Sequence, residues 1–309
     1  MITRSQTSQD NAPLDADPCW VCGSTRLVLY KRSDVQEGLS SRSFAITDSD
    51  YGRTGELYRC QDCGFLQCTD IRNALSFYEQ LEDKEYEEGR TERALQARKL
   101  LALVKPEKGR GRLVDIGAGS GILVEQATAL GYEAEGVEPS NWLREQAIGR
   151  GLPVHLGVFP HPNVEAGIDL VTLVDVIEHV SEPVALLRSI RSFMADDGVG
   201  LVVTPDVGSA TARLLGKHWW HFRFAHIGYF DKKTLLLALS RAGLEPIRVG
   251  RPSWYFAADY LLERINRYLP KFLRVPVSKY WGKFIIPLNL RDSLYVVFRK
   301  TAGYSNHEQ

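Results

Sequence analysis

Short apolar runs alternate with helically spaced segments along most of the chain after residue 110. The runs rich in Val, Leu and Ile predict strands at 112–117, 133–139, 154–157, 168–175 and 200–205, with Gly198 preceding the last. The segments between them predict helices at 122–130, 140–150 and 183–195. Ser140 is the expected cap of the second helix, and Ser181 with Pro183 opens the third. Strands that alternate with helices predict an α/β fold with a doubly wound parallel sheet.

The remaining pattern divides the chain into further units. Asp231 is the expected cap of a helix over 232–242, and 246–251 with 293–300 predicts a final strand pair separated by an insertion at 252–290. Thr91–Val104 has helical spacing. We therefore expect five consecutive units: a disordered lead-in at 1–17, a small cysteine-containing unit at 18–70, a helical linker or lid at 71–110, the sheet domain at 111–300 and a tail at 301–309.

Composition places the chain among ordinary soluble globular proteins. Apolar residues make up 44% and charged residues 25% of the 309 residues, and 38 basic residues balance 38 acidic ones. This balance disfavours a nucleic-acid partner. Because no signal peptide or membrane span is evident, we expect a cytoplasmic location.

A glycine-rich turn joins the first predicted strand of the sheet to the first helix. In "DIGAGSG" the glycines Gly117, Gly119 and Gly121 follow a G-x-G-x-G spacing. The nicotinamide fingerprint G-x-G-x-x-G has its third glycine where this chain has Ile122. Glu138 ends the next strand, 17 residues after Gly121. A carboxylate at this place can accept hydrogen bonds from both hydroxyls of a ribose. The alternative is that Glu138 is a solvated loop acid.

The motifs "LVDIGAGSG", "GVEPS", "DLVTLVDVIEHV" and "GVGLVVTP" together resemble class I S-adenosylmethionine-dependent methyltransferases. The resemblance implies a Rossmann-like seven-stranded sheet whose last strand is antiparallel, and S-adenosylmethionine as cofactor. It implies that the methionine end is held by Asp115, Gly117, Ala118, Gly119 and Gly121 and the ribose by Glu138. It also implies that the adenine is lined by Pro139, Ser140, Val158 and Phe159, and that Asp175 faces the methionyl group.

Two sequence segments offer catalytic groups. Glu178 and His179 resemble the Glu-x-x-Glu-His metal site of ubiquinone-type O-methyltransferases, although the first acid here is Asp175. A divalent-metal site, a general base and a structural hydrogen bond all remain open for this pair. The segment "HWWHFRFAHIGYF" at 218–230 predicts an aromatic wall beside the acceptor with His226 facing it. Alternatively, its aromatic residues complete a core and His226 caps the helix after Asp231.

Two Cys-x-x-Cys-Gly sequences precede the sheet domain. Cys19, Cys22, Cys60 and Cys63 predict a closed, structural zinc site, with unrelated reduced or redox pairs as the alternative, and Cys68 is surplus. The segment resembles zinc-ribbon modules that precede methyltransferase domains in sugar, polysaccharide and natural-product biosynthesis. That resemblance implies a wall or lid of the acceptor pocket. Tyr78 and Tyr86 either fold over the cofactor or pack the linker onto the sheet.

The whole pattern predicts methyl transfer from S-adenosylmethionine to a sugar-bearing or similar small molecule. A hydroxyl acceptor is favoured over carbon or nitrogen. The competing hypothesis is a non-catalytic regulatory or nucleic-acid-binding protein that keeps the fold. Residues 255–290 interleave aromatic and basic side chains, which is typical of a peripheral membrane contact at the inner face, a homodimer surface or a solvated cap.

Overall fold

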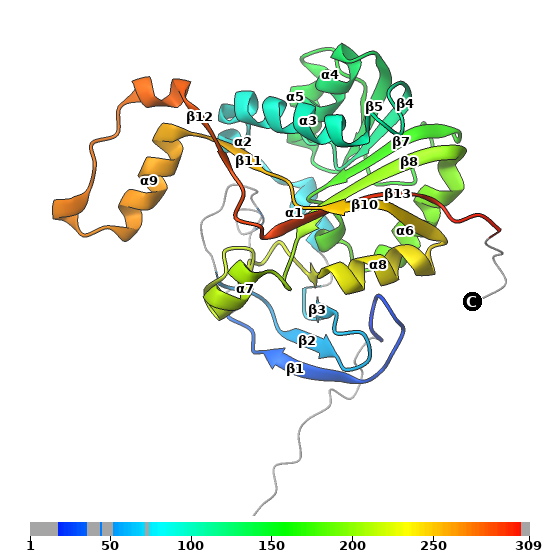
Figure 1. The fold of residues 1–309 in the computed structure, drawn as a ribbon, viewed down its shortest axis with the longest axis horizontal. Coiled ribbons are helices and arrows are strands. Elements are labelled where there is room, and N and C mark those ends of the chain that lie inside the picture. The colour runs from blue at the N-terminus through cyan, green and yellow to red at the C-terminus, as the bar shows by residue number, and fades with distance from the viewer. Residues whose placement is uncertain (1–17, 36–43, 45–51, 72–73, 304–309) are drawn as a thin grey trace, which may run out of the picture.

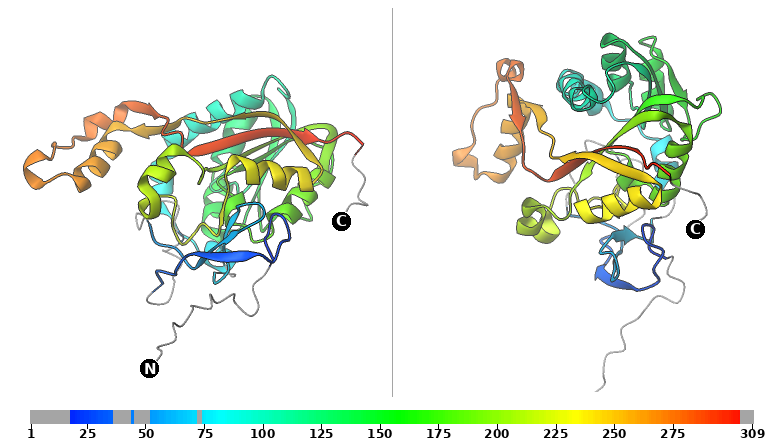
Figure 2. Two further views of the ribbon diagram at one scale, coloured as in Figure 1. Left: turned by 60° about the horizontal axis from the view of Figure 1, so that its bottom comes forward. Right: turned by 45° about the vertical axis from the view of Figure 1, so that its right-hand side comes forward.

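The computed structural model describes residues 18–35, 44, 52–71 and 74–303 (Figure 1). The predicted disordered lead-in at 1–17 and residues 304–309 of the predicted tail lie outside the described residues. In the described part, a large twisted sheet carries helices on both faces, and a smaller sheet lies beside it (Figures 1 and 2).

The large sheet has seven strands in the order β10-β13-β8-β7-β4-β5-β6. Strand β13 pairs antiparallel with β10 and with β8, whereas β8, β7, β4, β5 and β6 are parallel. The seven-stranded doubly wound fold with an antiparallel last strand is thereby confirmed. The strands are β4 Gly111–Ile116, β5 Tyr132–Glu138, β6 Val154–Leu156, β7 Ile168–Val174, β8 Met194–Pro205, β10 Leu244–Gly250 and β13 Ser293–Lys300.

Strand β8 begins earlier than the sequence predicts. It starts at Met194, which pairs with Ile168, so the prediction that Gly198 precedes the strand is wrong. The register shifts between Ile168 and Leu170, and a Cβ at Gly198 would lie 2.7 Å from the Ile168 carbonyl oxygen. Gly198 therefore permits a close backbone approach at an irregularity inside the strand.

Helices cover the two faces of the large sheet. The side chain of Leu113 packs with helices α3 Arg90–Val104 and α4 Ile122–Ala129, and that of Val114 packs on the opposite face with α6 Pro183–Phe193 and α8 Lys232–Arg241. This alternation explains why the strands read as continuous apolar runs.

Two of the three predicted helix starts have side-chain caps. Ser140 Oγ accepts a hydrogen bond from the backbone N–H of Leu143 and starts α5 Asn141–Ile148, and Asp231 forms a capping box with Thr234. The start of α6 differs, because its cap residue is Glu182 without a side-chain hydrogen bond and Pro183 is the first helical residue.

The smaller sheet combines the N-terminal unit with a strand from the sheet domain. Its order is β1 Leu27–Lys31, β2 Leu57–Cys60, β3 Leu66–Cys68 and β9 Gly228–Tyr229, all antiparallel. We call the described part of residues 18–70 the ribbon. Leu66 pairs with Tyr229, and the N–H of Cys68 donates to the carbonyl of Ile227 at 2.7 Å. The ribbon sheet is thus completed by the segment at 218–230.

The aromatic side chains of this segment form a core against the ribbon. Trp219, Phe222 and Phe224 are 5% exposed or less and pack with Leu57 and Leu66 of the ribbon. The prediction of an aromatic wall facing the acceptor is wrong for these three residues, and the alternative of a completed core describes them. Their burial removes large apolar surfaces from water at the ribbon interface.

Shorter elements complete the fold. They are α1 Ala74–Glu79, α2 Lys84–Glu88, η2 Ile177–His179, α7 Ala210–Leu215 and η3 Gly216–His218. Residues 252–291, which we call the arm, project from the body (Figures 1 and 2). The arm contains β11 Trp254–Ala257, α9 Ala258–Tyr268, η4 Lys271–Leu273, η5 Lys279–Lys283 and β12 Ile285–Leu288. Among the described residues, each helix is too short or too polar to cross a bilayer.

Docking of the ribbon predicts a large stability effect at one buried side chain. Phe65 is fully buried and its ring lies 4.8 Å from that of Phe230. We expect Phe65→Ala to lower the free energy of unfolding by about 3–5 kcal/mol, because it leaves a cavity. Phe272→Ala is the matched control, since Phe272 is 85% exposed, and it should change stability by less than about 0.5 kcal/mol. Equal denaturant midpoints for the two variants would contradict this packing.

Candidate functional site

The glycine loop, residues 117–121, lies at the carboxyl end of β4. Gly117, Gly119 and Gly121 have φ values of 73°, 55° and 75°, which side chains other than glycine rarely adopt. The N–H groups of Gly117 and Ala118 donate to the carbonyl of Val137 on β5. The loop is therefore tied to the end of the neighbouring strand, where ligands bind in open α/β sheets.

Glu138 is held against this loop by two backbone donors. Its Oε2 accepts from the N–H of Gly119 at 2.7 Å and its Oε1 from the N–H of Ser140 at 2.8 Å. Each oxygen keeps a further lone pair for a ligand hydroxyl. Burial raises the pKa of Glu138 to about 7, against the lowering effect of these N–H groups.

Asp115 is the second buried acid at this strand edge. Its Oδ1 accepts from the hydroxyl of Thr172 on β7 at 2.6 Å. Burial raises the pKa of Asp115 to about 7, with the hydroxyl opposing and the charge of Glu138 adding to the rise. Neighbouring carboxyl groups whose pKa values are raised to about 7 are typical of functional sites.

The residues expected at the adenine differ in their surroundings. Val158 is 49% exposed, whereas Phe159 is buried and its ring packs edge-on against Phe193 at 5.1 Å. The hydroxyl of Ser140 is buried and donates to the carbonyl of Leu81. Pro139 is partly exposed beside it. Contact of these four residues with an adenine stays a prediction.

Tyr86 on α2 lies directly over the glycine loop. A Cβ built at Gly119 would come within 2.8 Å of the Tyr86 hydroxyl, so only glycine permits this approach. The guanidinium of Arg93 on α3 lies over the ring of Tyr86, 4.1 Å from its centroid. Burial raises the pKa of Tyr86 to about 12. Tyr86 also packs against the core of the sheet, as the second of its two predicted roles requires, and its contact with a cofactor stays a prediction.

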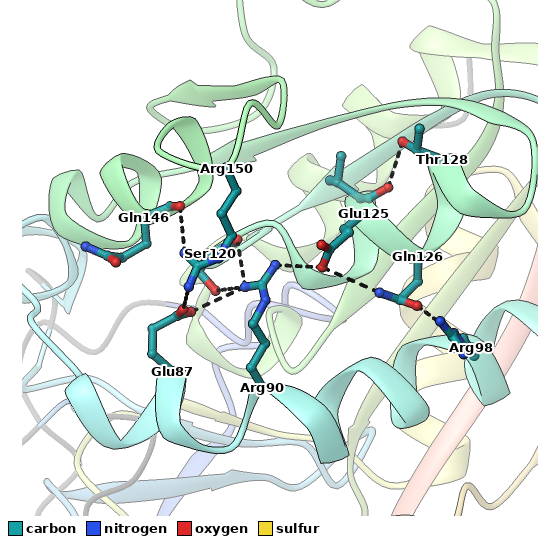
Figure 3. Close-up of polar contacts among 10 residues, drawn as sticks. Glu87, Arg90, Arg98, Ser120, Glu125, Gln126, Thr128, Gln146 and Arg150 are labelled. Carbon is teal, nitrogen blue, oxygen red and sulfur yellow. Dashed lines mark hydrogen bonds and ion pairs between the residues drawn. The ribbon is translucent and has the colours of Figure 1, made fainter.

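A charged network fastens these helices onto the loop (Figure 3). Arg90 donates to Ser120 Oγ at 3.1 Å and to Glu125 Oε2 at 2.7 Å. Glu87 accepts from Arg150 at 2.6 Å and lies 3.5 Å from Arg90. Several partly buried, mutually linked ion pairs position α2 and α3 more firmly than one exposed pair does. Sequence reasoning missed this network.

Asp175 follows β7 in a left-handed conformation. Its φ is 54°, which is uncommon outside glycine and frequent at ligand sites. Asp175 is exposed to solvent in this structure, and partial loss of solvation beside the neighbouring residues raises its pKa to about 6. The charges that oppose this rise in pKa most strongly are those of His221, Arg93 and Arg223.

Three side chains converge next to Asp175. Glu178, His179 and His226 each offer an atom, and these atoms lie within 4.8 Å of one another. We call them the His–Glu cluster. Glu178 is 1% exposed, and its Oε1 has no hydrogen-bond partner among the described residues, whereas Oε2 accepts from Thr204. An orphaned buried carboxylate oxygen facing two imidazoles fits a divalent cation.

Both imidazoles of the cluster are neutral. Burial lowers the pKa of His179 to about 4 and that of His226 well below its ordinary value. Nδ1 of His179 lies 2.6 Å from both the Tyr78 hydroxyl and the carbonyl of Ala225, and Nδ1 of His226 lies 2.9 Å from the carbonyl of His221. These carbonyls fix the protonated nitrogen of each ring, so its Nε2 is a proton acceptor. His226 does not cap the helix after Asp231.

Asp292 adds an acidic partner at the same end of the sheet. It accepts from the Trp220 indole at 2.8 Å and lies 3.3 Å from Nε2 of His221. Burial acts to raise the pKa of Asp292, but the His221 and Trp220 groups outweigh it and the net shift is downward. A negative charge is therefore held beside His221, whose ring is stacked 5.8 Å from that of His226.

The four predicted cysteines meet at the ribbon turns. The sulfurs of Cys19 and Cys63 lie 3.5 Å apart, those of Cys22 and Cys60 lie 3.4 Å apart, and all four are within 4.8 Å of one another. Zn–S bonds of about 2.3 Å in a tetrahedron place sulfurs roughly 3.8 Å apart, so the set fits zinc. Cys68 lies outside this cluster and donates to Asp70.

The family comparison agrees with this geometry. The model of a family described as "Methyltransferase domain" matches residues 86–249, more than half of the chain. The chain belongs to this family. The matched methyltransferase domain includes the glycine loop, Glu138 and the His–Glu cluster, and it leaves out the cysteines and the arm. The family resemblance stated from the motifs is confirmed.

Curated relatives of this methyltransferase domain share one name. A ubiquinone biosynthesis O-methyltransferase of Rhodopseudomonas palustris strain BisB5 is 31% identical over 123 residues, 38% of this chain and 45% of that protein. The protein of that name from strain HaA2 is 28% identical over 190 residues, 60% of this chain and 56% of its own length. The chain spans about half the length of the curated relatives it matches. A solved S-adenosylmethionine-dependent methyltransferase from Thermotoga maritima is 20% identical over 70% of this chain and 95% of its own, with a TM-score of 0.48.

The methyltransferase domain brings the predicted site residues into two groups. Asp115, the glycine loop and Glu138 lie together, and Glu178, His179 and His226 lie together beside Asp175. Asp175 is absent from the cluster that fits a cation, where His226 takes its place. Arg90, Arg93 and Asp292 carry no motif and could not be distinguished in the sequence from solvated charges.

The four-cysteine cluster predicts the metal content of the purified protein. We expect one zinc per chain, and its loss together with a lower melting temperature in Cys60→Ser, because the small ribbon depends on the closed site. Cys68→Ser is the matched control, since Cys68 is equally buried but lies outside the cluster. Metal analysis and thermal melts measure both effects. Loss of zinc from Cys68→Ser alone would contradict the assignment.

Proposed function

We propose that this protein transfers the methyl group of S-adenosylmethionine to a hydroxyl of a small molecule. The observation that carries the proposal is the glycine loop with Gly119 N–H bonded to Glu138 at 2.7 Å, a built cradle at the carboxyl ends of β4 and β5. Family membership supports S-adenosylmethionine as the donor.

The donor end uses backbone and acid groups. Glu138 accepts hydrogen bonds from the two ribose hydroxyls, and the loop N–H groups face the methionine end. Tyr86 and Arg93 cover the loop from α2 and α3 and exclude water from it. The sulfur then points toward Asp175 and the His–Glu cluster.

The acceptor end needs orientation and a proton acceptor. Methyl transfer from a sulfonium is an in-line displacement, and holding nucleophile and methyl in line supplies roughly 7–11 kcal/mol. A hydroxyl also has to lose its proton. Neutral His226, held by the carbonyl of His221, has an acceptor nitrogen for this step. His179, ordered by Tyr78, lies beside it.

The same cluster fits a divalent cation, with His226 in the place of Asp175, the first acid of the metal site that the resemblance to ubiquinone-type O-methyltransferases implied. Glu178, His179 and His226 would hold it. Such an ion supplies Lewis-acid chemistry that lowers the pKa of an acceptor hydroxyl. Burial raises the pKa of Glu178 well above its ordinary value, and the residue would hold such an ion as the ionised carboxylate.

The acceptor class is the finer part of the proposal. The ribbon resemblance supports a sugar-bearing or natural-product acceptor, and the curated relatives are named for O-methylation in ubiquinone biosynthesis. Both are hydroxylated small molecules, which favours oxygen over carbon or nitrogen. We propose a structural role for the zinc, because a four-cysteine site leaves no open position.

His226→Ala tests the acceptor side. We expect labelled methyl transfer to fall by about 10²-fold or more, while adenosylmethionine affinity by calorimetry changes less than about threefold. His218→Ala is the control, because His218 is exposed three residues before His221. An equal loss of turnover and affinity would reject an acceptor-side role. Wild-type activity lost to a chelator and restored by Mg²⁺ would assign the cluster to a metal; indifference to both would leave His226 as the base.

Donor binding should depend on pH through the two buried carboxyls. With pKa values of about 7, the ionised forms of Asp115, proposed at the methionine end, and of Glu138, proposed at the ribose, become scarce at pH 6. We expect adenosylhomocysteine to bind about tenfold more tightly at pH 8 than at pH 6 for each carboxyl that must be ionised. Calorimetry across this range measures the slope, and Glu138→Gln should flatten it while weakening binding.

Without ligand, the same shift has the opposite consequence for stability. Between about pH 4 and 7 the native state binds more protons at these carboxyls than the unfolded chain does, so they lower stability as pH rises. A donor affinity that is constant from pH 6 to 8 is the result that would contradict this account.

A further inference from the structure

Exposed apolar side chains are concentrated in the arm. Eleven of the 22 exposed large apolar side chains among the described residues lie between Tyr260 and Leu290. The most exposed aromatic ones are Phe272 at 85%, Tyr280 at 76% and Phe284 at 68%. Apolar side chains gathered in this way mark an interaction surface.

The exposed side chains are held by an ordered scaffold. Strands β11 and β12 pair from Trp254 with Leu288 to Ala257 with Ile285, and the N–H of Ala258 donates to the carbonyl of Phe284. The Asn266 amide group and the backbone of Val275 exchange two hydrogen bonds, at 2.7 and 3.0 Å. The exposed aromatic residues therefore belong to an ordered segment, and this segment projects from the body (Figures 1 and 2).

The net positive charge of the arm favours an anionic partner. Residues 252–291 contain seven basic and two acidic residues in a chain whose total charge is zero. Lys271 and Lys283 flank the exposed aromatic residues, and the ammonium of Lys283 lies 5.8 Å from the ring centroid of Tyr280. Two arms with a net charge of +5 repel each other, which disfavours a second arm as the partner. An anionic surface is favoured.

We infer that the arm docks on the surface of an anionic lipid bilayer. Its aromatic side chains enter the headgroup boundary and its Lys and Arg side chains bind lipid phosphates. The arm lies on the membrane and does not span it, since α9 has only 11 residues. The inference concerns binding alone, so it holds or fails independently of the proposed methyl transfer.

Both ends of the arm join the acceptor side of the site. Arg251 at its start pairs with Asp206 after β8, and Asp292 at its end holds Trp220 and His221. A docked arm therefore brings the acceptor side of the domain close to the lipid surface. An acceptor embedded in or attached to lipid can reach the cluster without crossing bulk water.

Vesicle co-sedimentation of the full chain tests the inference. We expect binding to phosphatidylcholine vesicles that contain about one-third phosphatidylglycerol, little binding to pure phosphatidylcholine, and release as salt rises from 50 to 300 mM. Lys271→Glu/Lys283→Glu should weaken binding roughly thirtyfold. Phe272→Ser/Phe284→Ser should weaken it at least about tenfold.

Leu214→Ser is the matched control, because Leu214 is 87% exposed on α7 outside the arm; it should bind as the wild type does. Unchanged thermal melts show that the arm variants fold. Equal binding of the wild type to both vesicle types, or none to either, overturns the inference. So does a solution dimer in sedimentation velocity that Phe272→Ser/Phe284→Ser dissociates, because a second copy then covers the arm.

Discussion

The pairing of β3 with β9 is the interaction on which the arrangement of the site depends. Strand β9 has only two residues, yet it joins the ribbon to the methyltransferase domain. Next to it, Ile227 receives the N–H of Cys68 on one side and donates its own N–H to the carbonyl of Glu178 on the other. His226 directly precedes Ile227. The backbone that positions Glu178 and His226 is therefore hydrogen-bonded to the ribbon through Ile227. The ribbon in front of the sheet is thus bonded to the edge that bears the His–Glu cluster, and the burial of Phe65 against Phe230 adds apolar contact to these few hydrogen bonds.

Burial acts in opposite directions on the acids and the imidazoles, and the two effects suit each other. It raises the pKa of Asp115 and Glu138 to about 7 and that of Glu178 well above its ordinary value, and it lowers the pKa of His179 and His226. Without ligands the two imidazoles are therefore neutral, and the three carboxyl groups are less ionised than exposed ones. A ligand that donates hydrogen bonds or brings positive charge restores the ionised carboxylates. A ligand bound there would therefore change the charge of buried groups, in an environment where fixed dipoles and charges have their largest effect.

Local signals predicted most of the fold. The apolar runs became strands, and Ser140 and Asp231 cap helices because their oxygens satisfy free N–H groups within three residues. The glycine loop and the cysteine pairs were found because their chemistry demands fixed spacings. What failed depends on distant residues. The aromatic composition of 218–230 does not reveal that Trp219 covers the ribbon, and Asp292 meets Trp220 across 72 residues. Arg90 and Arg93 look like any solvated charge until α3 is placed on the loop.

The position of Tyr86 has a consequence for turnover. Because its hydroxyl rests on Gly119, a molecule as large as an adenosyl donor cannot settle on the glycine loop from this side, or leave it once spent, unless the short helix that bears the ring lifts away. That helix is held by Glu87, whose carboxylate pairs with Arg150 and with Arg90 at the start of α3. Entry and release of a donor at this loop would therefore require these ion pairs to open, and such conformational steps limit turnover in many enzymes.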